Sequence, residues 1–143
     1  MKKGNPKGIK TLADLSGKTV SVEVGTTNKT FLDAASAKLK KQGMAAIKVT
    51  TFPKDTDAAS ALKTGRVDAY FGDSPVVAYY IARDSTFGFA GAPVNPIVVG
   101  MALRKGDPLI GKVQKQVNAM YADGKMKSIL AKWKMSAFAL KGK

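Results

Sequence analysis

Two short polar segments carry the residue types best suited to hold a ligand. They contain Glu23, Gly25, Thr26 and Thr27 in the first segment, and Asp73 and Ser74 in the second. The hydroxyls and backbone N–H groups that follow Gly25 would lie at the start of a helix, where unpaired donors and the helix dipole favour a carboxylate or another anion. Asp73 offers the opposite chemistry, an acceptor for a ligand ammonium. Together the two segments match a zwitterion.

Each of these residues also has a simpler structural interpretation. A Gly-Thr-Thr turn is typical of an ordinary capped helix. Asp73 suits the N-cap position before Pro75, since Pro is favoured at the first positions of a helix. Glu23 fits the polar phase of an alternating strand and would then face solvent. Its functional alternative is a second carboxylate in the site that faces a ligand side chain.

The composition excludes several classes of enzyme. The chain has no His and no Cys, so the usual zinc, haem and iron–sulfur ligands, thiol catalysis and Ser-His-Asp triads are all missing. Ser74 therefore has no histidine partner. Acid–base catalysis by Glu23 with Asp73 gains no support from their spacing. We expect no enzymatic activity, no cofactor and no metal site.

The spacing of apolar residues, together with the Gly and Pro residues that end strands and helices, predicts the secondary structure that must position these residues. The predicted strands cover 20–24, 47–52, 67–71, 87–90 and 97–103. A helical turn is predicted at 11–15, and helices are predicted at 28–41, 55–62, 76–83, 107–123 and 126–133. Residues 55–57 are expected to cap the helix at 55–62. Strands that alternate with helices predict an α/β fold, a mainly parallel sheet with helices on both faces, followed by two C-terminal helices. In such sheets ligands bind at the carboxyl ends of strands, where both polar segments lie.

Near Arg104 the predicted strands give way to two consecutive helices, which indicates a domain boundary. We expect an extended lead-in at residues 1–8, an α/β lobe at 9–104, C-terminal helices at 105–135 and a tail at 136–143. The aromatic residues of the first part are expected to pack the sheet against its helices, namely Tyr70, Phe71, Tyr79 and Tyr80.

The net charge is +14, from 24 basic and 10 acidic side chains. The lysines are scattered along the chain, with no basic block and no aromatic nucleic-acid motif, so specific nucleic-acid binding is not expected. No stretch reaches the ~18 uncharged apolar residues that a membrane span needs. Residues 1–3 resemble the start of a signal peptide, but Gly4-Asn5-Pro6 follows where an apolar region would be required, so no export signal is expected.

Six segments in order carry a family resemblance. They are 9–20 (IKTLADLSGKTV), 24–27 (VGTT), 61–69 (ALKTGRVDA), 73–75 (DSP), 99–107 (VGMALRKGD) and 122–133 (ADG, ending in Trp133). In this register the chain resembles family 3 extracellular solute-binding proteins, the periplasmic amino-acid receptors of ABC importers. The resemblance covers nearly the whole chain.

The resemblance implies a bilobal parent in which this chain is lobe 2 with the helices that return to lobe 1, while most of lobe 1 is absent. It implies an amino-acid ligand, an ABC permease as partner and a periplasmic location. Thr26 and Thr27 would help to bind the ligand α-carboxylate, and Asp73 would hold its α-ammonium. Glu23 matches a variable position that contacts the ligand side chain, which suggests a cationic amino acid. The predicted ligand-binding set is Glu23, Gly25, Thr26, Thr27, Asp73 and Ser74.

The last two helices carry a large apolar face whose usual partner would be lobe 1. Its members are Leu109, Ile110, Val113, Val117, Met120, Met126, Ile129, Leu130 and Trp133. Leaving each exposed would forgo about 1.5–3 kcal/mol, so we predict self-association through these helices. The alternative to an amino-acid-binding module weakened by the loss of lobe 1 is a folding fragment with no appreciable ligand binding. An extracellular sensor domain and a dehydratase-like enzyme are weaker alternatives.

Overall fold

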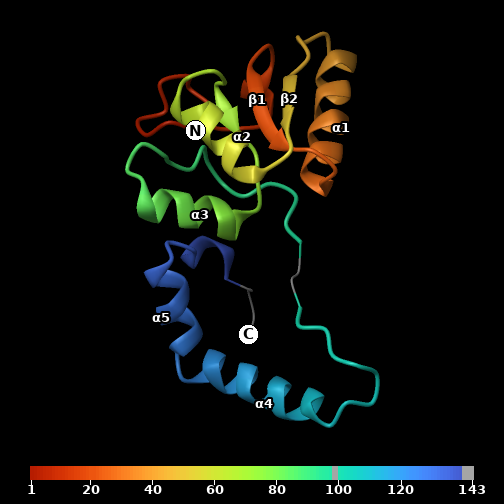
Figure 1. Cartoon of the computed structure of the whole chain (residues 1–143), viewed down its shortest axis with the longest axis vertical. Helices are drawn as coiled ribbons and strands as arrows, with labels where there is room; N and C mark the ends of the chain where they lie inside the picture. Colours follow the sequence, from red (N-terminus) through yellow and green to blue (C-terminus); the bar gives the residue numbers. More distant parts are fainter. Residues whose placement is uncertain (98–99, 140–143) are drawn as a thin grey trace. The chain divides into compact units, whose positions relative to one another are not determined.

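The computed structural model describes residues 1–97 and 100–139. The chain divides into two compact units, Met1–Ala92 and Pro93–Lys143 (Figure 1). The boundaries predicted after residues 8, 104 and 135 stay predictions. No helix of the described ranges is long and apolar enough to cross a membrane.

A parallel sheet forms the centre of the first unit. Its strands are β1 (Thr19–Glu23), β2 (Lys48–Phe52) and β3 (Ala69–Tyr70), in the order β2-β1-β3. β1 pairs in parallel with both neighbours, as strands joined by helical crossovers do. The carboxyl ends of the three strands therefore meet at one edge of the sheet. The predicted α/β class is confirmed.

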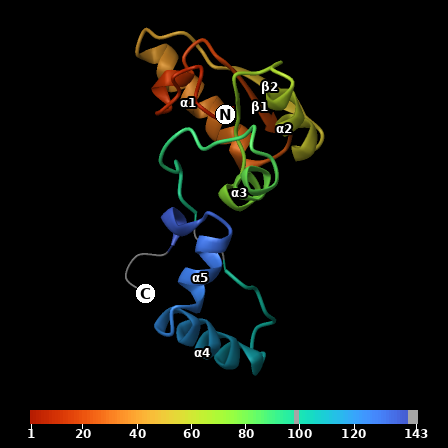
Figure 2. The same cartoon turned by 90° about the vertical axis from the view of Figure 1, so that its left-hand side faces the viewer.

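Helices cover both faces of this sheet, as predicted. The helices of the first unit are α1 (Thr27–Lys41), α2 (Asp55–Lys63) and α3 (Ser74–Arg83), after a short 3-10 turn, η1 (Ala13–Leu15). Val20 and Val22 share a core cluster with Leu32 of α1. Ser21 points to the opposite face, because side chains alternate along a strand, and its hydroxyl donates to Ala58 O in α2 at 2.8 Å. Figure 2 shows β1 and β2 running between α1 and α2.

Apolar burial explains why this unit is stable without disulfides. Val20, Val22 and Leu32 are fully buried, and each buried side chain of this size contributes about 1.5–3 kcal/mol. On the other face, Leu62 and Val67 form a smaller cluster. Buried Ser21 is the polar exception, and its two carbonyl partners satisfy it.

The strand predicted at residues 87–90 is wrong for this structure. Only Phe87 bridges, in antiparallel fashion, to Lys2 of the lead-in. The lead-in turns away at Gly4 and Asn5, both at positive φ, so it offers no further partner for a ladder. The strand predicted at 67–71 is shorter than expected and spans Ala69–Tyr70, because the Asp68 carboxylate instead accepts from Thr19 N.

The second unit contains α4 (Leu109–Ala122), α5 (Lys125–Lys132) and a 3-10 turn, η2 (Ser136–Phe138). Both helices match the prediction, with Gly124 at positive φ between them. In the strand predicted at 97–103, Ile97 and residues 100–103 have no regular secondary structure; Val98 and Val99 lie outside the described residues, as do 140–143 of the predicted tail. Neither α4 nor α5 buries a residue.

Candidate functional site

A pocket of about 350 Å³ lies at the carboxyl edge of the sheet in the first unit. Its walls come from the end of β1, from the N-termini of α1 and α2, from the segment that joins β3 to α3 and from the first turn of α3. The lining residues are Glu23, Thr26, Thr27, Asn28, Asp55, Phe71, Asp73 and Val76. The fold thus brings together two polar segments that are far apart in the sequence, at the place where parallel sheets bind ligands.

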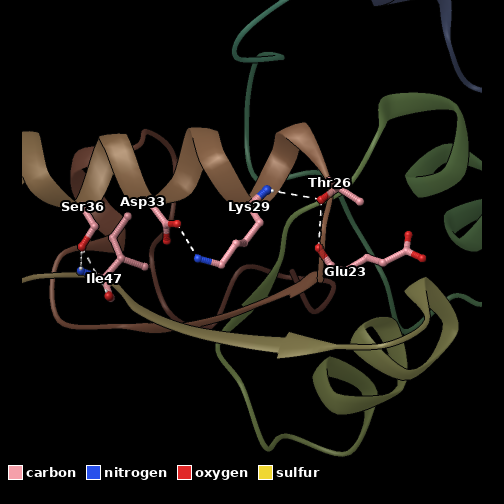
Figure 3. A network of polar contacts seen from close by, with 6 residues as sticks. All are labelled: Glu23, Thr26, Lys29, Asp33, Ser36 and Ile47. Carbon is pink, nitrogen blue, oxygen red and sulfur yellow. Dashed lines mark hydrogen bonds and ion pairs between the residues drawn. The ribbon is translucent and has the colours of Figure 1, made fainter.

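Thr26 caps α1, as its sequence context predicts. Its hydroxyl accepts from Lys29 N at 3.3 Å and donates to Glu23 O at 2.9 Å (Figure 3). Helix geometry leaves the N–H groups of Thr27 and Asn28 without an intrahelical acceptor. These amides, the Thr27 hydroxyl and the helix dipole make this end of α1 suited to a carboxylate.

Gly25 and Ser74 belong to the predicted set but do not line the pocket. Gly25 has φ +75°, a left-handed conformation that glycine adopts without steric cost. It therefore makes the turn from β1 into α1. Ser74 is the first residue of α3. A ligand-binding role for either residue stays a prediction.

Asp73 occupies the N-cap position of α3, but its side chain makes no capping hydrogen bond. Its Oδ1 accepts instead from Asn28 Nδ2 at 3.0 Å. This contact links the start of α1 to the start of α3, and it places an oriented carboxylate on the pocket wall. The predicted N-cap position of Asp73 is therefore confirmed, while its carboxylate bonds to Asn28 and not to the backbone of α3.

Glu23 is the last residue of β1 and is half-buried. Its backbone oxygen accepts from Thr26, while its carboxylate forms no hydrogen bond or ion pair with the described residues. Figure 3 shows the side chain extending away from α1. On α1 itself, Lys29 pairs with Asp33, and Ser36 accepts from Ile47 N at 3.0 Å. The Ser36 contact holds the helix beside the start of β2, and neither contact involves the Glu23 carboxylate.

The sequence interpretation missed Asp55, which was expected only to cap α2. Asp55 is the first residue of that helix and lines the pocket. Its Oδ1 accepts from the Tyr70 hydroxyl, and its Oδ2 accepts from the Tyr80 hydroxyl at 3.4 Å. Burial, reinforced by the Asp55 hydrogen bond, raises the pKa of Tyr70 far above its ordinary value, so this phenol stays a donor. The position of Asp55 just after β2, at the carboxyl end of a predicted strand, was the sequence signal that could have identified it as a pocket residue.

Aromatic side chains support one wall. Phe71 stacks on Phe31 of α1, with ring centroids 5.6 Å apart, and also lines the pocket. Tyr70 and Tyr80 pack edge to face. The expected packing role is wrong for Tyr79, which is 42% exposed and lies under the Arg83 guanidinium.

The lining residues include three carboxylates and no lysine or arginine, although the whole chain carries a net charge of +14. The pocket is therefore locally anionic, although the N-termini of α1 and α2 form parts of its wall. Among residues 1–97 and 100–139, no group of three or more His, Cys, Asp or Glu side chains could hold a metal ion. The arrangement suits a ligand that has one anionic and at least one cationic group.

The chain is similar to known amino-acid-binding proteins. The L-cystine-binding protein TcyJ of Escherichia coli (strain K12) is 30% identical over 135 residues, which are 93% of this chain and 48% of that protein. The chain thus spans about half the length of the curated relatives that it matches.

Solved structures give the same picture. Substrate-binding domain 2 of Lactococcus lactis GlnP, in an open conformation, superposes with a TM-score of 0.75 at 28% identity, over 92% of this chain and 55% of that one. An ancestral arginine-binding protein bound to arginine gives a TM-score of 0.62 at 34% identity, over 92% of this chain and 57% of that one. The similarity is to one lobe, as the sequence resemblance implied.

A known family, described as NMT1/THI5 like, matches residues 2–105. That range holds the whole sheet and every residue of the pocket. The chain therefore belongs to the NMT1/THI5-like family, with the fold of one lobe of an amino-acid solute-binding protein of ABC transporters.

Proposed function

We propose that this chain binds a free amino acid, with a preference for cationic ones, and delivers it for ABC import. The observation that carries the proposal is the pocket itself, where the N-terminus of α1 faces carboxylates from three other segments. Cystine-binding and arginine-binding relatives support an amino-acid ligand.

The two ends of the pocket suit the two charges that all amino acids share. The ligand α-carboxylate would bind the Thr27 hydroxyl and the free amides of α1, where the helix dipole favours an anion. Its α-ammonium would bind Asp73, whose second oxygen has no partner among the described residues. Asn28 donates to the first oxygen and so fixes the orientation of this carboxylate.

Glu23 supports the preference for a cation. A half-buried carboxylate without a partner is costly unless a ligand pairs with it. Arginine or lysine supplies that partner, whereas a neutral side chain leaves the Glu23 carboxylate desolvated and unpaired. Binding rather than catalysis is proposed, because a chain without His and Cys offers only carboxylates and hydroxyls at this site.

We expect weak binding by this chain alone. A ligand that lies in an open pocket on one lobe keeps much of its surface in water, whereas tight sites bury 70–90% of the ligand. A Kd on the order of 1 mM is expected. Relatives named as an arginine-binding periplasmic protein and as an ABC transporter arginine-binding protein support a periplasmic location and an ABC permease as partner, both of which belong to the proposal.

Titration of ¹⁵N-labelled chain with arginine and with glutamine, followed by amide chemical shifts, tests the function. We expect saturable shifts at Thr27, Asn28 and Asp73, with tighter binding of arginine. Glu23→Gln should lower the affinity for arginine more than that for glutamine. Asp57→Asn is the matched control, since Asp57 is exposed and absent from the pocket.

Absence of saturable shifts with any amino acid, in a chain that is folded, would support the alternative of a fragment without appreciable binding. An unchanged preference in Glu23→Gln would contradict the cationic part alone. The two results are separable in one set of titrations.

We also propose that two copies pair through α4 and α5. The support is the exposure of large apolar side chains, since Leu109, Ile110, Ile129 and Trp133 are each at least 43% exposed. Light scattering on eluted protein should give a mass near twice 15.1 kDa at high concentration, and Ile110→Asp should return the monomer mass. A monomer at all concentrations would contradict the proposal.

A further inference from the structure

We propose that Asp55 is a second specificity-determining residue of the pocket, which selects a guanidinium-bearing ligand through a carboxylate held by Tyr70 and Tyr80. The inference rests on the proposed function and deepens it, because it names the distal group of the ligand. The Asp55 carboxylate would favour a guanidinium over a neutral group of the same shape and over the smaller ammonium.

Three elements meet at this carboxylate. Asp55 begins α2, Tyr70 comes from β3 and Tyr80 from α3. Each carboxylate oxygen accepts from one of the two phenols. An ionised carboxylate has about four lone-pair sites, so one site on each oxygen stays available. Two such sites side by side match the paired donors of a guanidinium.

The orientation of Asp55 is fixed before any ligand arrives. Tyr70 is half-buried and packs on Tyr80. The Tyr70 hydroxyl lies directly against Gly72, where a built Cβ would be 2.1 Å from it, so the missing side chain at Gly72 leaves room for the phenol. A group held in place by its neighbours loses little entropy when it binds, which raises its contribution to affinity.

Glu23 and Asp55 act on the same region of the pocket. Both line it, and after burial the charges of both carboxylates raise the pKa of Tyr80. A guanidinium has five donors in a rigid fork, whereas a lysine ammonium has three donors on one atom. The guanidinium is therefore the cation best able to engage both carboxylates at once.

A purely structural role for Asp55 would also explain its tyrosine contacts, so the test needs a readout that structure alone would not change. That readout is the ratio of affinities for arginine and citrulline, which have similar shape but differ in charge. Amide-shift titrations of the 143-residue chain measure both. In Asp55→Asn the ratio should fall about tenfold, the lower end for a hydrogen bond to a charged group.

The matched control is Asp57→Asn. Asp57 lies in the same first turn of α2, so the variant removes the same charge from the same helix without touching the pocket. Its arginine-to-citrulline ratio should stay within about twofold of the wild type. An equal fall in both variants would assign the effect to general electrostatics and overturn the proposal.

Tyr70→Phe is the second variant, in case Asp55→Asn does not fold. It keeps the Asp55 charge but removes one of the two donors that orient it, and we expect a fall of about threefold in the same ratio. Wild-type chain that binds arginine, with an unchanged ratio in folded Asp55→Asn, overturns this inference and leaves the proposed function standing. Wild-type chain that binds no amino acid overturns both.

Discussion

Replacing Thr26 by Ala tests how the proposed anion-binding end of the pocket is held in place. The Thr26 hydroxyl is used twice within the protein, as acceptor for Lys29 N and as donor to Glu23 O. The variant therefore removes the α1 cap and the link from α1 to the end of β1. Thr26→Ser is the control, because it keeps the hydroxyl and loses only a methyl group.

The magnitude follows from these two contacts. Loss of an N-cap hydroxyl costs about 1 kcal/mol, and loss of a neutral hydrogen bond about another 1 kcal/mol. The free energy of unfolding of the first unit should fall by about 2 kcal/mol. For a unit of this size, that change lowers the melting temperature by about 10 °C.

The assay must report on the first unit alone. The single tryptophan, Trp133, lies in the second unit, so its fluorescence is unsuitable. Amide peaks of Val20 and Val22, which are fully buried, should be followed during urea and thermal unfolding instead. Equal stability of Thr26→Ala and Thr26→Ser would refute the assigned role of the hydroxyl. Weaker arginine binding in Thr26→Ala alone would show that the cap also orients the amides of α1.

Three further perturbations test the fold around the site. Leu32→Ala should lower the free energy of unfolding of the first unit by about 2–5 kcal/mol, because Leu32 is fully buried between α1 and the sheet; a loss below about 1 kcal/mol in urea unfolding would contradict this packing. The Thr19 N–H, more than the Lys7 ammonium, holds the pKa of Asp68 below its ordinary value of 3.8, so its stabilisation is present above pH 3.8 and is lost as the pH falls through the lower folded pKa. As the pH falls through this range, the urea midpoint should drop less in Asp68→Asn than in wild type. Parallel plots of midpoint against pH for the two proteins would contradict a stabilising role of the ionised Asp68 carboxylate. Gly72→Ala should displace the Tyr70 hydroxyl that lies over Gly72 and reduce the arginine-to-citrulline affinity ratio about threefold; unchanged binding would show that Tyr70 does not orient Asp55.

The anionic pocket in a strongly basic chain has a consequence for solution conditions. A net charge of +14 repels a cationic ligand at long range, while the three pocket carboxylates attract it at short range. Salt screens the long-range part over about 8–10 Å. Titrations at two ionic strengths therefore separate the local preference for a cation from the repulsion of the chain as a whole.

Much of the fold could be predicted from the sequence because its signals are local. The alternation of Val20, Ser21 and Val22 predicted β1, and the hydroxyls after Gly25 predicted the start of α1. Strand-to-helix alternation predicted a parallel sheet, and the strand-end rule then placed Glu23 and Asp73 at one edge. Periodicity, capping and crossover geometry each depend on residues close together in the chain.

Only the tertiary structure decided which side chains meet. Asp55 has the sequence context of a helix cap, and its role beside Tyr70 and Tyr80 depends on contacts across 15 and 25 residues. Asp73 likewise has the local pattern of a cap, but its partner is Asn28, 45 residues away. The strand expected at 87–90 failed because its partner in the lead-in turns away after Lys2. In each case the local pattern allowed two outcomes, and the hydrogen-bond partner that decided between them is set by the packing of distant segments.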